Sequence, residues 1–305
     1  MSADSYVLAA GSWSAIPGLA ALVRPIGGRI VVVVVGSEAD AQVASEAGVD
    51  AVVRVAVPVS GAPECAADTV IDLVQQAGPA LVVAPTGATE RVLLGAVAGR
   101  LGLPVMTSVS AASMGENGVQ VTHTVFGGIV ERTEEAAGTL LLSTDPVARV
   151  EPSGDVAPIE TRSVAAQRMT VTGSSPATHA AADLSVADRV VAVGRGLKAE
   201  PDLALMRNLA DVLHAELGCS RPLAEGLDWL PKDRYIGMSG RRVSPALYLA
   251  VGISGQLQHM SGARGAGLVV AVNSDPKAPI FAECDYGVVG DLYEVVPALT
   301  AALGG

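Results

Sequence analysis

Aromatic side chains are scarce in this sequence and make up only 3% of its 305 residues. Proteins that bind single-stranded nucleic acid use aromatic side chains as stacking platforms, and few are available here. Basic residues are also in the minority, 20 against 31 acidic residues, which gives a formal net charge of −11 at pH 7. This negative charge argues against nucleic acids and anionic membrane surfaces as partners.

Cysteine and histidine are rare as well, with three and four copies. Cys65, Cys219 and Cys284 are odd in number and widely spaced, so they predict neither a disulfide framework nor a CxxC metal site. The sequence contains no HExxH motif and no paired-histidine spacing. We therefore expect no bound metal.

Long apolar segments are missing too, although 50% of the residues are hydrophobic. The longest aliphatic run lies near residues 30–35, whereas a helix needs about 18–20 apolar residues to span a bilayer. The first residues lack the basic region of a secretory signal. These absences together predict a cytoplasmic protein without a transmembrane helix.

What the sequence does contain is a regular alternation of strand-like and helix-like segments. Its length fits two domains of ordinary size or one large domain. In the first half, β-branched runs predict strands at residues 6–10, 29–35, 51–57 and 80–84, and helical spacing predicts helices at 39–47, 64–77 and 90–101. This rhythm predicts a mostly parallel, doubly wound α/β sheet with helices on both faces.

The rhythm changes after Pro104. Residues 105–111, 119–126 and 139–143 alternate or are β-branched, and we interpret them as added strands rather than further βαβ units. A Gly- and Ser-rich stretch near residues 173–187 indicates a boundary. We therefore predict two domains, an N-terminal α/β domain over residues 1–183 and a second α/β domain over residues 184–305.

The second domain repeats the strand-then-helix pattern. A short strand at 190–193 runs into a glycine-containing turn, and leucines every four residues predict a helix over 203–217 with Gly218 as its stop. The remaining predicted elements are strands at 246–251, 268–272 and 286–289, and a helix at 292–303.

The turn after the first of these strands, Gly194-Arg195-Gly196, resembles a phosphate-binding loop. Glycine lets the backbone approach a phosphate, and a following helix supplies N–H donors. A nicotinamide-binding domain would need a ribose-binding carboxylate about 20 residues further on. Glu216 has that spacing but falls in a predicted helix, so the ribose ligand is missing. On this motif alone we favour the simpler interpretation, a tight turn with an exposed Arg195.

A second glycine-flanked turn follows the strand at 246–251. Ser254 lies between Gly252 and Gly255, where it can cap a helix and donate to a phosphate, and His259 follows five residues later. More polar turns occur at 219–222, 237–241, 273–276 and at Asp291, and each has an ordinary explanation as a turn or N-cap. Their shared place at strand ends indicates a large nucleotide-like ligand.

One cysteine lies in these turns. Cys219 near Arg221 has either a lowered pKa or the properties of a small buried thiol, and we favour the buried thiol. We find no Ser-His-Asp order and no paired carboxylates that would indicate a hydrolase.

The order of these turns resembles the FAD domain of the electron transfer flavoprotein alpha subunit. The matching motifs are residues 193–198, 219–221, 235–241, 245–259, 273–281 and 285–292, and together they cover roughly residues 188–305. The N-terminal half resembles the family only in its α/β pattern and in residues 84–89. The resemblance implies that the second domain is a flavodoxin- or Rossmann-like FAD-binding domain.

The family resemblance also implies a function. The chain would form a heterodimer with a beta subunit, carry FAD, and pass electrons from acyl-CoA or similar dehydrogenases to a quinone reductase or another acceptor. Such a protein serves fatty acid beta-oxidation as an electron carrier and is not itself an enzyme. In an electron-bifurcating relative, the beta subunit holds a second FAD instead of AMP. Two further possibilities are a structural paralogue without active flavin and a nicotinamide-dependent enzyme, and the missing ribose ligand disfavours the second.

The resemblance assigns roles to residues by position. The residues implied to contact FAD are Arg195, Ser220, Arg221, Ile236, Gly237, Met238, Ser239, Ser254, Gly255, Gln256, Leu257, Gln258, His259, Asn273, Asp291 and Leu292. Those expected along the ADP and ribityl portions are Arg195, Ser220, Asn273, Asp291 and Leu292. Residues 254–259 would hold the pyrophosphate and place His259 near flavin O2.

The remaining implied contacts surround the isoalloxazine ring. Residues 236–239 would run beside it with the Ser239 hydroxyl near N5, and Arg221 would lie over it. This sequence departs from the family pattern at Met238, where glutamine is usual, at Ser239, where threonine is usual, at Pro222 and at Gln256. We expect these changes to shift the flavin potential without removing the FAD-binding framework.

Overall fold

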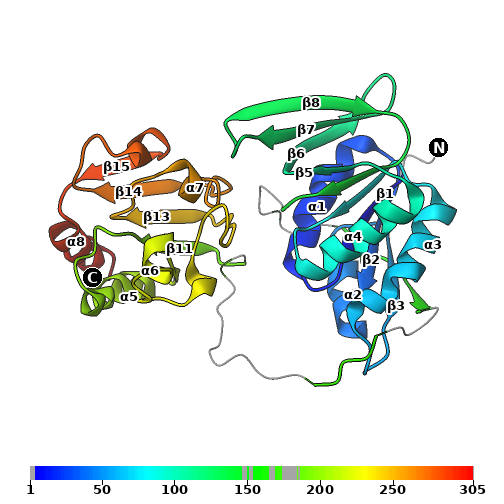
Figure 1. Ribbon diagram of the computed structural model, residues 1–305, viewed down its shortest axis with the longest axis horizontal. Helices are drawn as coiled ribbons and strands as arrows, with labels where there is room; N and C mark the ends of the chain where they lie inside the picture. Colours follow the sequence, from blue (N-terminus) through cyan, green and yellow to red (C-terminus); the bar gives the residue numbers. More distant parts are fainter. Residues whose placement is uncertain are drawn as a thin grey trace. The chain divides into compact units, whose positions relative to one another are not determined.

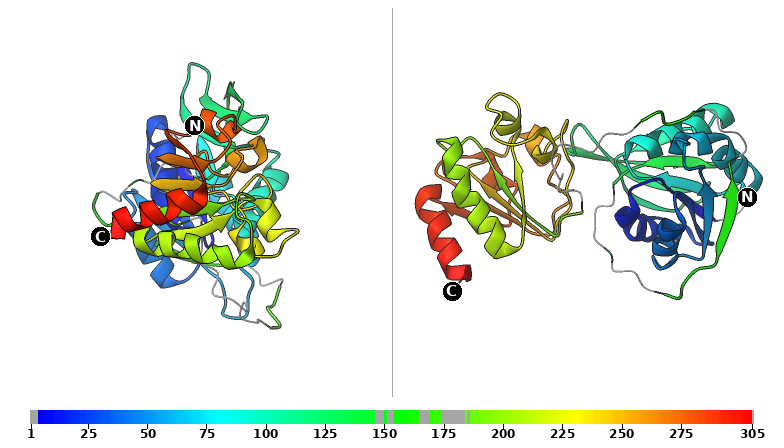
Figure 2. Two further views of the ribbon diagram at one scale, coloured as in Figure 1. Left: turned by 90° about the vertical axis from the view of Figure 1, so that its left-hand side faces the viewer. Right: turned by 90° about the horizontal axis from the view of Figure 1, so that it is seen from below.

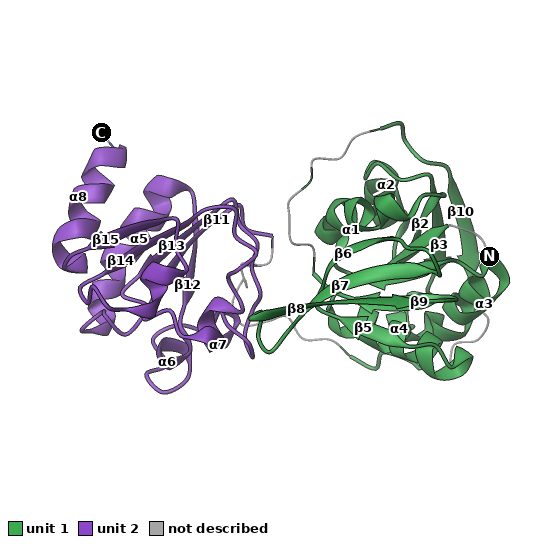
Figure 3. Cartoon of the chain, turned by 90° about the horizontal axis from the view of Figure 1, so that it is seen from above, with its two compact units in different colours: residues 1–146, 150–176 green, residues 147–149, 177–305 purple. Residues whose placement is uncertain are grey.

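The computed structural model describes residues 4–145, 150, 154–164, 169–173, 184 and 186–304. The chain divides into two compact units, residues 1–146 with 150–176 and residues 147–149 with 177–305 (Figure 3). The predicted boundary between residues 183 and 184 adjoins residues outside the described part, so it stays a prediction. Among the described helices, none has the length and apolar character needed to cross a membrane.

Unit 1 is built on a seven-stranded sheet in which every neighbouring pair is parallel (Figure 1). Its order is β10-β3-β2-β1-β4-β9-β5. The strands are β1 (Ser5–Ala9), β2 (Ile30–Val35), β3 (Ala51–Ala56), β4 (Leu81–Ala84), β5 (Val105–Thr107), β9 (Leu140–Ser143) and β10 (Ile159–Ser163). All six residues of β2 are buried, which is typical of a parallel strand covered on both faces.

Helices cover both faces of this sheet. They are α1 (Ile16–Val23), α2 (Glu38–Ser45), α3 (Ala67–Ala77) and α4 (Ala88–Leu101). Alternate residues of β2 enter opposite cores, with Val32 packing on the side of α1 and α2 and Val33 on the side of α3 and α4. The doubly wound α/β fold predicted from the sequence is therefore confirmed.

Local sequence signals set the ends of these helices. Ser37 and Asp40 form a capping box at the start of α2. Gly78 adopts a left-handed conformation, φ +54°, immediately after α3, as glycine does at many helix ends.

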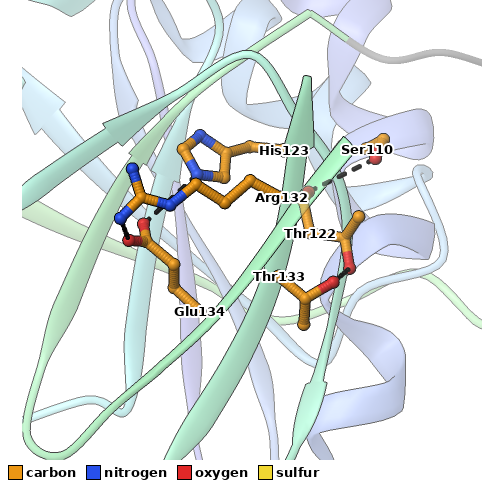
Figure 4. A network of polar contacts seen from close by, with 6 residues as sticks. All are labelled: Ser110, Thr122, His123, Arg132, Thr133 and Glu134. Atoms are coloured by element: carbon orange, nitrogen blue, oxygen red, sulfur yellow. Dashed lines mark hydrogen bonds and ion pairs between the residues drawn. The ribbon is translucent and has the colours of Figure 1, made fainter. Parts of the chain in front are cut away.

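A separate three-stranded antiparallel sheet contains β6 (Val109–Met114), β7 (Val119–Val125) and β8 (Val130–Ala136). Polar side chains link β7 to β8 across one pair of strands (Figure 4). The hydroxyls of Thr122 and Thr133 are 3.0 Å apart, and Glu134 contacts both His123, at 3.2 Å, and Arg132. Such cross-strand pairs stabilise an antiparallel sheet.

The added-strand prediction is correct in part. Residues 119–125 of the predicted strand do lie in the antiparallel sheet, but β9 belongs to the parallel sheet, between β4 and β5. All four residues of β9 are buried, as in a central strand, which explains the difference. Helix α1 and strands β8 and β10 were not predicted from the sequence; the last is an edge strand with every residue exposed.

Unit 2 contains a five-stranded parallel sheet in the order β12-β11-β13-β14-β15. Its strands are β11 (Arg189–Val193), β12 (Glu216–Cys219), β13 (Leu247–Val251), β14 (Val269–Asn273) and β15 (Tyr286–Val289), and its helices are α5 (Leu203–Leu213), α6 (Arg221–Ala224), α7 (Leu257–Met260) and α8 (Leu292–Gly304). Helices α5 and α8 pack together on one face (Figures 1 and 2). Numbered within the unit, the strand order is 2-1-3-4-5, the flavodoxin-like arrangement.

The predicted helix over 203–217 is wrong at its end. Helix α5 stops at Leu213, and His214 takes a left-handed conformation with φ +49°. Glu216 to Cys219 then form β12, so Gly218 is not a helix stop. The fourth leucine of the repeat, Leu217, belongs to this strand, and the four-residue spacing is accidental there.

Candidate functional site

The strand order of unit 2 puts its topological switch point between β11 and β13, because the chain continues in opposite directions from these two strands. Gly194 follows β11 and Gly252 follows β13. The Gly196 N–H donates to the Gly252 carbonyl at 3.1 Å, and a Cβ on Gly194 would overlap that carbonyl. Only glycine permits this close approach of the two main-chain segments. In sheets of this kind, ligands bind at the strand ends beside the switch point.

The turn after β13 has free main-chain donors. Gly255 has φ +80°, and a Cβ there would overlap the main chain of Ile280, whose N–H donates to the Ser254 carbonyl at 3.0 Å. Among the described residues, no acceptor takes the N–H groups of Ser254, Gly255 or Gln256. Consecutive free N–H groups in a turn form a concave anion-binding site.

The capping role predicted for Ser254 is wrong. Helix α7 starts at Leu257, its N-cap is Gln256, and the Ser254 side chain makes no cap hydrogen bond. Only four residues are helical, so few peptide dipoles add up along this helix. The N–H groups without an acceptor among the described residues therefore lie in the turn itself, ahead of Leu257 and Gln258.

The loop at residues 236–241 packs directly against this turn. The Met238 N–H donates to the Gln258 carbonyl at 2.7 Å, and the Ile236 N–H donates to the Cys219 carbonyl at 2.9 Å. A Cβ on Gly237 would lie 2.9 Å from the Gln258 carbonyl oxygen. Two segments that the resemblance assigned to the flavin ring and the pyrophosphate are thus brought together.

His259 lies at the centre of this region and is 8% exposed. Its Nε2 atom is 2.6 Å from the Tyr248 hydroxyl, and its Nδ1 atom is buried without a hydrogen-bond partner among the described residues. Burial lowers the pKa of His259 to about 4, and the backbone of Ile236 opposes this shift. The imidazole is therefore an uncharged hydrogen-bonding group at pH 7.

Ser239 is exposed, unlike His259, but its hydroxyl also has a tyrosine neighbour. Its hydroxyl lies 3.1 Å from the hydroxyl of Tyr235, a tyrosine that is 6% exposed. Met238, beside it, is 47% exposed and makes no polar side-chain contact among the described residues. The hydroxyl expected near the flavin is therefore present and oriented by a neighbour.

The ends of β12 and β11 are joined by Ser220, whose N–H donates to the Val193 carbonyl at 2.9 Å. The next residue, Arg221, is bound to Glu225, with 2.8 Å between Nε and Oε2, and its side chain is 64% exposed. Arg195 is exposed on the first turn. Both guanidinium groups are accessible for binding a ligand.

Cys219 has no nucleophilic role. Its side chain is completely buried, and burial raises the pKa of the thiol to about 12, against a smaller opposite effect of Arg234. The buried-thiol interpretation is therefore confirmed.

Three predicted contact residues use their groups within the protein. The Asn273 amide donates to the Ile253 carbonyl at 2.8 Å, and the Asp291 carboxylate accepts the Tyr293 N–H at 2.9 Å, which confirms its capping position. Leu292 is 6% exposed, and its side chain would lie 3.2 Å from a Cβ on Gly196. Asn273 and Leu292 thus support the two glycine turns, and Asp291 caps α8.

Three tyrosine hydroxyls next to this site were not predicted from the sequence. The Tyr248 hydroxyl is hydrogen-bonded to the imidazole of His259, and the Tyr235 hydroxyl is hydrogen-bonded to the Ser239 hydroxyl, as described above. Tyr293 binds Asp202 and accepts the Lys198 N–H at 2.8 Å, which fixes the turn after β11. One signal was available, because the sequence has only five tyrosines and most lie in this unit, namely Tyr235, Tyr248, Tyr286 and Tyr293.

Glu216 is also placed differently from the prediction. It lies in a strand, but at the start of β12, whereas the ribose-binding carboxylate of a nicotinamide domain stands at the end of the second strand. Its carboxylate is 2.7 Å from the Arg234 guanidinium. The ribose ligand is therefore missing for a different reason from the one first inferred.

The fold and these turns define a two-unit α/β protein with a nucleotide-type site at the switch point of its second unit. Sequence comparison identifies the family. Residues 183–264 match the electron transfer flavoprotein FAD-binding domain, and residues 18–174 match the electron transfer flavoprotein domain. The chain is 38% identical over 243 residues to YdiR of Escherichia coli K12, which is named as a putative electron transfer flavoprotein subunit.

Other relatives agree. Protein FixB of Escherichia coli O127:H6 is 39% identical over 245 residues, and FixB of Shigella dysenteriae is 38% identical over the same length. Each alignment covers 78% of this chain and 78% of the relative. This chain belongs to the electron transfer flavoprotein alpha-subunit family, and its second unit is the FAD-binding domain of that family.

The residues of the site fit FAD. The N–H groups of residues 254–256, which have no acceptor among the described residues, suit a pyrophosphate. The glycines allow the protein main chain to come close to the phosphate groups. The buried Nδ1 of His259, which also has no partner among the described residues, suits a polar edge of the flavin. When bound, FAD accepts and releases electrons. In flavoproteins generally, the protein supplies the groups that position the cofactor and tune its electronic properties.

Proposed function

We propose that this chain is the FAD-carrying subunit of a heterodimeric electron carrier and holds the cofactor at the β11–β13 switch point. The pyrophosphate lies on the turn at residues 254–256, Ser239 and His259 face the flavin, and Arg195 and Arg221 contribute positive charge. The observation that carries this proposal is the buried Nδ1 atom of His259, which has no hydrogen-bond partner among the residues that the structure describes. The chain performs no substrate chemistry of its own.

Members of this family pair with a beta subunit, and exposed apolar side chains support such a partner here. At the β7–β8 turn of unit 1, Phe126 is 77% exposed and Ile129 is 65% exposed. Side chains of this kind are usually covered in an assembly. We propose that the complex works in the cytoplasm and transfers electrons from acyl-CoA or similar dehydrogenases, as in fatty acid beta-oxidation, to a quinone reductase.

Cofactor content tests the proposal. The chain is purified with its beta-type subunit, and the FAD released from the complex is measured by absorption. We expect one FAD per heterodimer, reduced on addition of an acyl-CoA dehydrogenase and its substrate. Two FAD molecules would support the bifurcating alternative, and a complex that takes up no FAD would contradict the proposal.

The potential tests the role of His259. Reduction of the flavin places negative charge at its N1–C2=O edge, where a hydrogen-bond donor is stabilising by about 1.5–3 kcal/mol. For one electron this corresponds to roughly 65–130 mV, using about 59 mV per tenfold change. We expect His259→Ala to lower the first reduction potential by about that amount, and an unchanged potentiometric titration would remove His259 from the site.

A further inference from the structure

The strongest unexplained contact in unit 2 joins Tyr248 to His259. Tyr248 lies on β13 and is completely buried, and its hydroxyl is 2.6 Å from His259 Nε2. The two ring centroids are 6.2 Å apart, and the ring planes are inclined at 44°. No second partner of this hydroxyl exists in the described part of the chain.

Both groups are uncharged at pH 7, because burial raises the pKa of Tyr248 and lowers that of His259 to about 4. The pair therefore shares one hydroxyl hydrogen and one ring hydrogen. If Nε2 carried the ring hydrogen and donated it, the tyrosine hydrogen would be buried without an acceptor. If the hydroxyl donates to Nε2, every hydrogen between the two rings is used, and Nδ1 carries the ring hydrogen.

The resulting Nδ1–H group has no acceptor in the described residues. The Ile236 main chain lies close to the ring and favours its protonated form, but no hydrogen bond of normal geometry joins it to Nδ1. Buried N–H donors without acceptors are rare in native proteins. The described residues therefore leave this donor to an acceptor that they do not supply.

We propose that Tyr248 is a positioning residue that fixes His259 as an Nδ1–H donor directed at a carbonyl oxygen of the flavin ring. This inference rests on the proposed function, which puts His259 beside FAD. Tyr248 acts only through the imidazole and need not touch the cofactor. Its hydroxyl selects which ring nitrogen carries the hydrogen.

The tautomer can be measured without the cofactor. The full chain is labelled with ¹⁵N-histidine and studied by NMR before FAD is added; spectra of His259→Gln assign the resonances. We expect a protonated Nδ1 and an unprotonated Nε2 in the wild type. Tyr248→Phe removes the donor to Nε2, so the Nε2–H form should become populated, whereas Tyr286→Phe, which removes an exposed hydroxyl from β15, should change nothing.

FAD binding provides the second readout. We expect Tyr248→Phe to raise the FAD dissociation constant of the heterodimer by about three- to tenfold and to lower the flavin potential, with no effect of Tyr286→Phe. A protonated Nε2 in the wild type, or an unchanged tautomer in Tyr248→Phe, would overturn the proposal.

The two proposals fail differently. If His259→Gln impairs FAD binding while the wild-type tautomer is Nε2–H, the FAD site stands and the role of Tyr248 is refuted. If His259→Gln leaves both FAD affinity and potential unchanged, the placement of FAD beside His259 is refuted, and the role of Tyr248 fails with it.

Discussion

The two parallel sheets of this chain differ in whether the main-chain N–H groups at their switch points are bound by carboxylates of the chain. In unit 1 the switch point lies between β1 and β4. There the N–H groups of Ala10 and Ser12 donate to the Glu90 carboxylate at 3.0 and 3.1 Å, and the Thr86 hydroxyl donates to Asp145 at 2.6 Å. Carboxylates of the chain itself thus occupy the position that an anionic ligand would take.

In unit 2 no carboxylate of the described chain enters the switch point between β11 and β13. The N–H groups of residues 254–256 have no acceptor in the part of the chain that the structure describes, and glycines shape the surface around them. Both sheets have the topology that binds nucleotides. The comparison indicates that the sheet topology fixes where a ligand can bind. The side chains at the strand ends determine whether that position is available to a ligand or filled by the chain itself.

The largest effect is expected at Gly255. An alanine there would adopt a left-handed conformation and overlap the main chain of Ile280, so Gly255→Ala should cost about 3–5 kcal/mol and abolish FAD binding. Denaturant unfolding and FAD titration measure both effects. The matched control is Gly99→Ala in helix α4, where a Cβ meets nothing within 4 Å and the helix should gain about 0.5–1 kcal/mol. Normal FAD binding by Gly255→Ala would contradict the assignment of this turn.

A slightly smaller effect is expected at the closed switch point of unit 1. Glu90 is 2% exposed, and Glu90→Ala leaves the N–H groups of Ala10 and Ser12 without their acceptor. We expect a loss of about 2–4 kcal/mol in the free energy of unfolding, with FAD affinity unchanged. If this variant lost FAD while unit 2 stayed folded, the contrast between the units would be wrong.

His259 should give a pH-dependent effect. Its folded-state pKa of about 4 lies below the ordinary value of 6.5, so the unfolded chain binds more protons between these values. The stability contribution is present above pH 6.5 and is lost as the pH falls through about 4. We expect a loss of about 2–3 kcal/mol in the FAD-free chain from pH 7 to pH 4 that His259→Gln removes.

A histidine elsewhere in the unit provides the control for that experiment. His214→Asn changes an exposed residue and keeps a side chain that tolerates the left-handed conformation of this position. Its unfolding curve should keep the wild-type pH dependence. Equal pH profiles for the wild type and His259→Gln would show that the imidazole is not buried as described.

The smallest effect is expected at the ion pair of Arg221 and Glu225. Both side chains are largely accessible, 64% and 37% exposed, so Glu225→Gln should change stability by at most about 0.5 kcal/mol. The variant frees the guanidinium of Arg221 and should therefore raise FAD affinity slightly. A large loss of stability would mean that this pair holds α6 in place.

The sequence predicted the elements whose patterns are local. The all-buried run of β2, and most of α3 and α4, follow directly from β-branched and helical spacing. It failed for β10, whose five exposed residues carry no apolar alternation, and for the end of α5. There His214 adopts a left-handed conformation that no residue type near it signals.

The residues of the candidate site also divide into those that local sequence predicts and those that it does not. Glycines at the strand ends were recognisable from the sequence, because close backbone approach restricts the residue type at Gly194 and Gly255. The partners of His259 and Ser239 were not recognisable. Tyr248 and Tyr235 reach them from other elements through packing of the folded core, which no spacing in the sequence records.

Amide hydrogen exchange of the full chain, with and without FAD, tests the contrast between the two switch points most directly. We predict that FAD slows exchange at residues 252–259 and 236–239 of unit 2 and leaves residues 10–12 and 86–90 of unit 1 unchanged. Protection at the unit 1 segments, with none at residues 252–259, would contradict the account.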